Sequence, residues 1–365
     1  MSRVIGIDPG TVSVDLCGLD EGAVFLDSSQ ATADALADPA AFVALLESHA
    51  PLDLVAGPSG YGLPLVAARD LTDRDLRLAY LAAEGEAGGI GGLRTLMRAL
   101  ARSALPVVLT PGVVHLESVP SHRKVNRIDM GTADKVCAAA LAIHDAAKRR
   151  GCRERDVSLI LLELGGAFSA ALAVDHGSIV DGLGGTSGPI GLRAAGALDG
   201  EVAFLAERVT KDLLFGGGAA AIAGAKAISA DELAASTTPR GRRAWDAYVE
   251  SAVKAIASLL VSTPGATEIV LSGRAAAAVA VHDAITRRLT TVMPRASVHV
   301  LTGFAQQAKQ AAQGAALVAD GLAGGAASAL VDAMKIRGAR GSAIDHLFVV
   351  SAETARAHLG IRDDT

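Results

Sequence analysis

Aromatic residues, cysteines and long apolar runs are all scarce in this sequence of 365 residues. Aromatics account for 3% of the chain although hydrophobic residues reach 50%, so we expect a core built from Ala, Val, Leu and Ile. No apolar run approaches the roughly 20 residues that a membrane-spanning helix needs. The N-terminus lacks a basic segment followed by an apolar signal region. We therefore expect a cytoplasmic protein with no membrane partner.

The few cysteines and the charge balance exclude further classes. Cys17, Cys137 and Cys152 are odd in number and lack the spacing of paired ligands, which argues against a disulfide framework and against a zinc site. The formal net charge of −5 provides no basic field for nucleic acid. The length is sufficient for two domains.

Glycine, by contrast, is abundant, with 40 residues, and it marks a turn near the N-terminus. Apolar runs at Val4–Ile7 and Val12–Leu19 predict two strands, and Gly22–Leu26 could extend them into a meander. Between the first two lies the turn "DPGT". Glycine there permits a close approach of the backbone to a ligand.

This first turn carries groups that suit a phosphate and its metal. The amides after Gly10 and the hydroxyl of Thr11 could bind phosphate, and Asp8 could orient a hydrated Mg²⁺. An ordinary hairpin turn is the alternative, because Asp, Pro and Gly are common turn residues.

The same pattern recurs after Gly151, in "VSLILLELGGAFSAALAVDHGSIVDG". We interpret the recurrence as a distant internal duplication. It predicts one domain over residues 1–150, a second over 151–325, and an extension over 326–365 that contains a strand at "DHLFVVS" and a helix.

In the second turn, Glu163 is separated from Gly165 and Gly166 by Leu164 alone. A β-bulge with a buried Glu is the alternative, but an unpaired buried carboxylate is costly. Metal-bound water or a nucleotide phosphate would be a better partner. The two turns together favour phosphate binding, with Asp8 and Glu163 as the metal-orienting carboxylates.

Further glycine turns follow in the second half. "SGR" offers Gly273 and Arg274 for a nucleobase and ribose, and "FGGG" offers Gly216 and Gly217. Arg193 lies in the Gly-rich stretch 182–201 as a candidate phosphate partner. Each of these could be a plain loop.

A cationic cluster lies in "HRKVNRIDMGTADK". Arg123, Lys124 and Arg127 suit an anionic substrate or a transferring phosphoryl group. Asp129 or Asp134 could act as general base if the acceptor is an alcohol. A solvated helix start with alternating charges is the alternative.

Helical spacing of apolar residues appears in several segments. The segments are Asp38–Ser48, Leu93–Ser103, Thr132–Arg149, Trp245–Thr263 and Gln306–Leu322. Asp38 is placed to cap the first of them, with Pro39 at its first position.

These motifs, in this order, resemble the acetate and sugar kinase, chaperone-ATPase and actin (ASKHA) superfamily. Ile5–Leu19 and Leu159–Val174 match its two phosphate motifs, Ile269–Arg274 its adenosine motif, and Thr132–Ala147 and Gln306–Gly325 its connecting helices. The resemblance implies an α/β fold of two duplicated actin/ribonuclease-H-like domains. Each would be a mixed sheet flanked by helices, with an ATP cleft between them.

Residues from about 55 to 205 are similar to a mainly archaeal family commonly described as predicted butyrate kinases. The matching strings include "AGPSGYGLPL", "HRKVNRIDMGTADK" and "IVDGLGGTSGPIG". The resemblance implies transfer of the ATP γ-phosphate to a small carboxylate. Characterised butyrate and acetate kinases carry His or Asn at the second phosphate motif, where this chain has Glu163.

The resulting hypothesis is a magnesium-dependent kinase. Asp8 and Glu163 would hold Mg²⁺ through water, and Ser59 and Tyr61 would shape the pocket of a small-molecule acceptor. The alternative is an ATP-hydrolysing regulatory or activator protein of the same fold. The Ala-rich stretches Ala138–Ala147 and Ala311–Ala323 are compatible with a homodimer.

Overall fold

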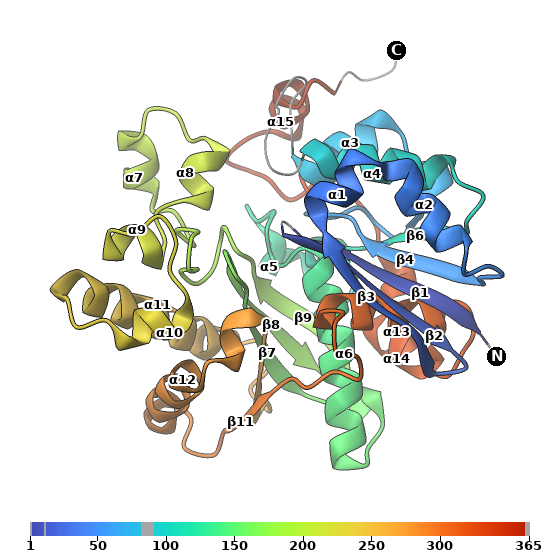
Figure 1. Cartoon of the computed structure of the whole chain (residues 1–365). Helices are drawn as coiled ribbons and strands as arrows, with labels where there is room; N and C mark the ends of the chain where they lie inside the picture. The colour runs from blue at the N-terminus through green and yellow to red at the C-terminus, as the bar shows by residue number, and fades with distance from the viewer. Residues whose placement is uncertain (1, 11, 82–90, 362–365) are drawn as a thin grey trace. The chain divides into compact units, whose positions relative to one another are not determined.

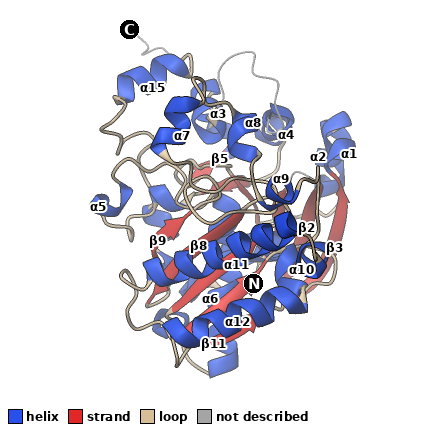
Figure 2. Ribbon diagram, turned by 90° about the vertical axis from the view of Figure 1, so that its left-hand side faces the viewer, coloured by secondary structure: helices blue, strands red, loops and turns tan. Residues whose placement is uncertain are grey.

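The computed structural model describes residues 2–10, 12–81 and 91–361, which form an α/β protein with two mixed sheets flanked by helices (Figures 1 and 2). The chain divides into two compact units. The first comprises Met1–Ile128, Thr132–Arg155 and Gly303–Thr365, and the second comprises Asp129–Gly131 and Asp156–Thr302. The prediction assigned residues 151–325 to the second domain, whereas the structure groups everything from Gly303 onward with the first unit.

The first unit contains a six-stranded sheet with the order β3-β2-β1-β4-β6-β5. The first three strands form the antiparallel meander expected from the sequence, and β4 and β6 run parallel to β1. The short β5 pairs antiparallel with β6 at the edge. Their bounds are β1 Arg3–Pro9, β2 Ser13–Asp20, β3 Ala23–Ala31, β4 Leu54–Pro58, β5 Val66–Ala67 and β6 Val107–Thr110.

The second unit repeats this arrangement in a five-stranded sheet with the order β11-β10-β7-β8-β9. Again the first three strands form an antiparallel meander, and the last two run parallel to the first of them. The recurrence in the sequence therefore corresponds to the same topology, built twice. The bounds are β7 Leu159–Leu164, β8 Ser169–Asp175, β9 Ser178–Leu183, β10 Glu268–Ser272 and β11 Ser297–Val300.

Helix α13 (Gln310–Leu322) packs directly on β1 and on α6 (Ala133–Arg150), as Figure 1 shows. Two glycines allow this contact. A Cβ at Gly6 would lie 2.1 Å from the backbone nitrogen of Ala316, and one at Gly314 would lie 1.8 Å from the carbonyl oxygen of Cys137. No larger residue fits at either place without moving backbone. This packing explains why the C-terminal part of the chain belongs to the first unit.

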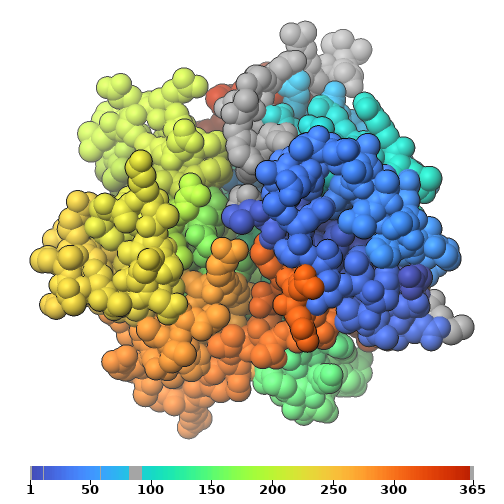
Figure 3. Space-filling view, in the orientation of Figure 1, coloured from blue at the N-terminus to red at the C-terminus, as the bar shows by residue number. Residues whose placement is uncertain are grey.

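The segment just before α13 is also tied to the N-terminal meander. The Asp27 carboxylate accepts hydrogen bonds from the backbone N–H groups of Gln306, Gln307 and Ala308. Figure 3 shows this orange-red segment at the surface, next to the blue N-terminal strands. The other helices of the first unit are α1 Thr32–Ala37, α2 Pro39–Glu47, α3 Asp73–Tyr80, α4 Gly91–Arg102, α5 Ser121–Lys124, α14 Ser328–Met334 and α15 Ala352–His358.

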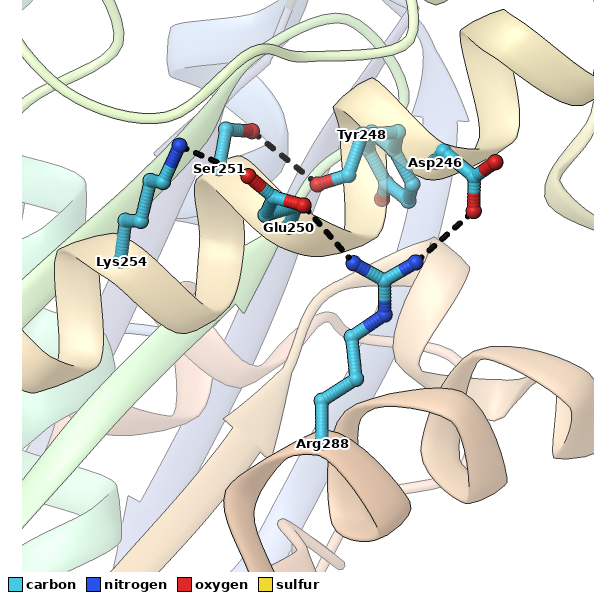
Figure 4. A network of polar contacts seen from close by, with 6 residues as sticks. All are labelled: Asp246, Tyr248, Glu250, Ser251, Lys254 and Arg288. Carbon is cyan, nitrogen blue, oxygen red and sulfur yellow. Dashed lines mark hydrogen bonds and ion pairs between the residues drawn. The ribbon is translucent and has the colours of Figure 1, made fainter. Parts of the chain in front are cut away.

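In the second unit, α11 (Pro239–Leu259) and α12 (Val279–Val292) cover one face of the sheet and share its apolar core (Figure 2). On their outer side, Arg288 of α12 bridges Asp246 and Glu250 of α11 at 2.8 and 3.2 Å (Figure 4). The smaller helices are α7 Gly200–Leu205, α8 Lys211–Phe215, α9 Ala219–Ala223 and α10 Ala230–Ala235.

The predicted helices are confirmed, with shifted ends. Asp38 caps α2 by accepting a hydrogen bond from the N–H of Ala41 at 2.9 Å, and Pro39 is its first residue. Helix α6 ends at Arg150, and Gly151 caps it in a left-handed conformation. The segment predicted from Gln306 becomes helical only at Gln310, because Asp27 holds the preceding amides in a loop.

The predicted strand at "DHLFVVS" is wrong. Residues 345–351 form turns and bends, in which the side-chain oxygen of Asn126 accepts hydrogen bonds from the N–H groups of Phe348 and Val349. The Phe348 side chain is 75% exposed. An apolar run alone could not reveal that these amides have a side-chain partner instead of a neighbouring strand. The predicted helix of this extension is present as α15.

In the described part of the chain, every helix is too short or too polar to cross a bilayer.

The contact between α13 and β1 makes a direct prediction for stability. Gly6→Ala should lower the free energy of unfolding by on the order of 3 kcal/mol, because the added methyl meets fixed backbone. Gly57→Ala, in β4, is the matched control, since its Cβ would lie 3.7 Å from the Cβ of Ile7 in ordinary contact. Denaturant unfolding of both variants measures the difference. Equal stability of the two would contradict the close packing.

Candidate active site

Two carboxylates face each other at the end of the first hairpin. Asp8 ends the buried part of β1, and the register pairs it directly with Asp15 of β2. The exposed fraction is 7% for Asp8 and 0% for Asp15. The hairpin turn begins at Gly10, whose N–H donates to the carbonyl of Ser13 at 3.0 Å. Thr11, predicted to bind phosphate, lies outside the described residues.

Lys309, which directly precedes α13, places its ammonium group beside this turn. Its Nζ lies 2.7 Å from the carboxylate of Asp15 and 2.5 Å from the hydroxyl of Ser13. A Cβ on Gly10 would lie 3.3 Å from the same nitrogen. The Lys309 side chain is 37% exposed, so its charge stays within reach of a ligand at the turn.

The N-terminus of α6 adds a further ion pair to this cluster. The carboxylate of Asp134 lies 2.6 Å from Lys135 Nζ and accepts a hydrogen bond from the hydroxyl of Thr132. Although burial opposes it, Lys135 and Thr132 hold the pKa of Asp134 below its usual value. Asp134 therefore remains an anion close to Asp8.

Burial, and next to it the charge of Asp134, raises the pKa of Asp8 from 3.8 to about 7, against the opposing pull of Lys309 and Lys135. Asp8 is thus a carboxylate whose negative charge lacks full compensation within the protein. A bound cation would favour its ionised form.

The donor set fits a hydrated divalent cation. Carboxylate oxygens are ligands that Mg²⁺ prefers, and Mg²⁺ usually keeps several waters while using one or two carboxylates and the substrate's phosphates. The Oδ1 atom of Asp15 is buried and has no hydrogen-bond partner among the described residues. No group of three or more His, Cys, Asp or Glu side chains in that part of the chain could hold a metal by itself. Asp8 and Asp15 would therefore hold the cation together with water and phosphate ligands.

In the second unit, the turn after β7 meets the turn after β10. Glu163 is half-buried at the end of β7 and pairs with Ser272 of β10. Gly273 has φ +86°, and a Cβ there would lie 2.5 Å from the carbonyl oxygen of Leu164. Gly165 lies beside the Glu163 carboxylate, since its Cβ would be 3.6 Å from Oε1. The structure thus brings two predicted glycine turns together.

The "FGGG" segment lies next to the same turn through the Gly-rich stretch. The N–H groups of Arg193 and Ala194 donate to the carbonyl of Ala167, and Gly217 forms a bridge with Ala194. Gly166 has open space where a Cβ would be. Gly216 ends α8, and the side chains of Arg193 and Arg274 are exposed. The result is a surface of the second unit lined by glycine backbone.

The basic residues of the predicted cationic cluster differ in burial and in hydrogen-bond partners. Lys124 is buried, its Nζ donates to the carbonyl of Leu116 at 2.8 Å, and burial lowers its pKa. Arg123 and Arg127 are half-buried. Asp129, which belongs to the second unit, accepts hydrogen bonds from the N–H and hydroxyl of Thr186 at 2.9 and 2.8 Å.

Ser59 and Tyr61 lie in the loop that follows β4. The Ser59 hydroxyl donates to the carbonyl of Thr110 and accepts from the N–H of Leu63, so it joins this loop to the end of the parallel strand β6. Tyr61 is 7% exposed. Both residues therefore shape this loop.

Sequence reasoning missed Asp15 and Lys309. Asp15 carried a usable signal, because a hairpin that turns near Gly10 places it opposite Asp8, as a lone charge in an apolar strand. Lys309 carried none, since the whole second unit and the larger part of the first separate it in sequence from the hairpin that it contacts.

The structure is similar to those of acid kinases. A propionate kinase from Francisella tularensis subsp. tularensis SCHU S4 matches with a TM-score of 0.61 at 14% identity, covering 86% of this chain and 99% of that one. Acetate kinase from Entamoeba histolytica matches with a TM-score of 0.57 at 13% identity, covering 80% of this chain and 87% of that one. Porphyromonas gingivalis acetate kinase matches with a TM-score of 0.56 at 14% identity, covering 86% of this chain and 98% of that one. At these identities the chains share the fold, the two-domain α/β architecture expected from the sequence.

A family model described as "Protein of unknown function (DUF1464)" matches residues 6–349. A search of curated proteins found no match.

The pKa of Asp8 predicts how stability depends on pH in metal-free buffer. Well below pH 3.8 the carboxyl group of Asp8 is protonated in both folded and unfolded protein, whereas at pH 8 the folded protein must hold a carboxylate whose pKa is about 7 instead of 3.8. The free-energy cost of ionising Asp8 in the folded protein is present at pH 8 and disappears toward pH 4. Asp8→Asn should therefore raise the free energy of unfolding at pH 8, by on the order of 1–4 kcal/mol, and leave it unchanged at pH 4.

Asp27→Asn is the control with the opposite sign. Despite partial desolvation, its three backbone N–H donors lower the pKa of Asp27. Its carboxylate therefore stabilises the fold at neutral pH, and this contribution to the free energy of unfolding is lost as the pH falls below the usual pKa of an aspartate. Thermal unfolding at several pH values measures both variants. A gain for Asp8→Asn that does not change with pH would contradict the assignment.

Proposed function

We propose that this chain, which belongs to the family described as "Protein of unknown function (DUF1464)", is an ATP-dependent phosphotransferase, because it shares the fold of acetate and propionate kinases. The acceptor of the γ-phosphate would be a small carboxylate, as the similarity to predicted butyrate kinases suggests. The observation that carries the proposal is the buried pair Asp8 and Asp15, with Lys309 beside it, at the end of the first hairpin of this fold.

In the first unit, Asp8 and Asp15 would hold hydrated Mg²⁺. The metal would neutralise charge on the phosphates of ATP, which is the main requirement for phosphoryl transfer. Lys309 holds Asp15 in place through its ion pair, and its exposed ammonium would attract the phosphates. The amides after Gly10 would contact the phosphates, because the N–H of Gly10 itself donates to the carbonyl of Ser13. Glu163, at the turn after β7 in the second unit, would be a further metal-orienting carboxylate.

In the second unit, the surface lined by glycine backbone would bind the nucleotide. Gly165 and Gly166 would contact phosphate, and Gly273 with Arg274 would line the adenosine side. Gly216 and Gly217 would border the same surface. Support comes from the open space at Gly166, which leaves its backbone accessible to a ligand, and from the close contact of Gly273 with the Leu164 carbonyl, which holds the two turns together.

The acceptor would be attracted by arginines. Arg123 and Arg127, with Arg193, are the proposed carboxylate partners, since Lys124 already donates to Leu116 and would instead hold the loop that carries Arg123. Ser59 and Tyr61 would shape the pocket through their loop. Asp129 would position the loop at Thr186. A carboxylate acceptor is already nucleophilic at neutral pH and needs no general base.

The proposal is tested by measuring ADP release from MgATP with acetate, propionate and butyrate as acceptors. Stimulation by one acid is expected. Asp8→Asn should lower this rate roughly a hundredfold or more, since it weakens charge stabilisation at the phosphates. Asp70→Asn is the control, because Asp70 is exposed and its one ion pair within the described residues is with Arg69, at 3.9 Å. Slow hydrolysis that no acceptor stimulates would indicate the regulatory ATPase instead.

A glycine pair tests the nucleotide surface of the second unit. Gly273→Ala should weaken ATP binding by about tenfold or more, because its backbone conformation and the nearby Leu164 carbonyl exclude a side chain. Gly265→Ala should change little, since nothing lies within 4 Å of its Cβ position. Calorimetric titration with ATP measures both variants, and circular dichroism checks their folding. Equal affinities would refute the assignment of this turn.

A further inference from the structure

The segment that leads into Lys309 is held by side chains and not by a helix or a strand. Residues 304–308 form bends, and α13 begins only at Gln310. Backbone N–H groups outside regular structure take side chains or water as partners. In this short segment, two side chains from different parts of the first unit supply those partners.

Asp27, on β3, holds the second half of the segment. Its Oδ2 accepts hydrogen bonds from the N–H groups of Gln306 at 2.7 Å and Gln307 at 3.1 Å. Its Oδ1 accepts from the N–H groups of Gln307 at 3.0 Å and Ala308 at 2.7 Å. Both carboxylate oxygens are therefore used. An asparagine could accept through one atom only, and its amide nitrogen would face an N–H group.

Gln313, in the first turn of α13, holds the rest of the segment. This residue is 2% exposed. Its Oε1 accepts from the N–H groups of Phe304 at 2.7 Å and Ala305 at 3.2 Å, and its Nε2 donates to the carbonyl of Ala308 at 2.6 Å. A Cβ at Gly303 would lie 2.0 Å from Oε1. The buried amide thus spends its acceptor and its donor on one stretch of backbone, and the glycine makes room for it.

Lys309 follows directly, and both ends of this residue are fixed. Its carbonyl accepts the N–H of Gln313 at 3.2 Å, within α13. Its Nζ lies 2.7 Å from the carboxylate of Asp15 and donates to the hydroxyl of Ser13 at 2.5 Å. A lysine side chain has many rotamers, and ordering it costs conformational entropy. A fixed backbone lowers this cost, because it sets the point from which the side chain reaches the hairpin.

We propose that Asp27 and Gln313 are positioning residues for Lys309, which hold its ammonium group where the phosphates of ATP would bind. They act through the backbone of residues 304–308 and touch no substrate themselves. A cation stabilises the charge of a transferring phosphoryl group best when it is already in place. The inference rests on the proposed phosphotransferase activity, because Lys309 has this role only if phosphates bind at the first hairpin.

A double-mutant cycle tests whether Asp27 acts through Lys309. ADP release from MgATP, with the acid that stimulates it, is measured for the wild type, Asp27→Asn, Lys309→Met and the double variant. Asp27→Asn should lower kcat/KM for ATP about tenfold and Lys309→Met about a hundredfold. The double variant should be no slower than Lys309→Met, because the two residues act as one. A loss equal to the product of the two single losses would overturn the proposal.

The cycle separates positioning from stability. A merely structural loss at Asp27 would lower the fraction of folded protein, and therefore the rate, by the same factor with or without Lys309. Asp38→Asn is the matched control, because Asp38 also accepts from a backbone N–H, that of Ala41 at 2.9 Å, but caps α2. It should leave kcat/KM unchanged, and an equal loss in Asp38→Asn and Asp27→Asn would contradict the assignment. Circular dichroism at the assay temperature checks that each variant is folded.

Chemical labelling tests the position of Lys309 without any activity. Trace acetylation with acetic anhydride, measured by mass spectrometry, gives the reactivity of Lys309 relative to that of the exposed Lys226. In the wild type this ratio should be low, because the ammonium is paired with Asp15. In Asp27→Asn and in Gln313→Met it should rise toward that of Lys226. An unchanged ratio in both variants would overturn the proposal.

The two measurements distinguish the inference from the function on which it rests. If no acid stimulates ADP release by the wild type, the phosphotransferase proposal fails, and labelling still decides whether the segment holds Lys309. Gln313→Met leaves three backbone groups without their partners. If that variant does not fold, Asp27→Asn decides the question by both measurements.

Discussion

The first unit depends on a contact between backbones. Helix α13 lies so close to β1 that the only side chain tolerated at position 6 is a hydrogen atom, and the same holds where Gly314 meets α6. This contact joins the last part of the chain to the first strand. It also sets the position of Lys309, which directly precedes α13 and forms an ion pair with Asp15. A packing constraint in the core thus determines an electrostatic feature of the candidate site.

The candidate site combines groups that are unfavourable for stability by themselves. Asp8 and Asp15 are buried acids and Asp134 is a half-buried one in the same cluster. The two lysines compensate their charge only in part, so the pKa of Asp8 is raised to about 7. Such an arrangement is retained where charge serves a ligand. A cation with bound water would balance the remaining negative charge. The Oδ1 atom of Asp15, which has no hydrogen-bond partner among the described residues, is one of the oxygens that such a cation or its water would contact.

The fold is more widely shared than the side chains. The chain matches the length of acid kinases closely, yet at 13–14% identity, so the inference of function has to come from the residues at the turns. The second unit illustrates this point. Its glycine turns meet because Gly273 accepts a backbone contact that any other residue would disturb, and the accessible backbone there is what the proposed nucleotide would use. In the first unit, the side chains of Asp27 and Gln313 hold the backbone that leads into Lys309.

The sequence by itself determined the strand–turn–strand units, their repetition, the glycine turns and the main helices, because these follow from apolar spacing and from turn chemistry that operate over a few residues. It also pointed to Asp8 and Glu163 as carboxylates at strand ends. Only the tertiary structure decided that residues from Gly303 onward join the first unit, that Lys309 meets Asp15, and that "DHLFVVS" is a loop held by Asn126. Each of these depends on contacts between residues that are far apart in the chain, for which local composition carries no signal.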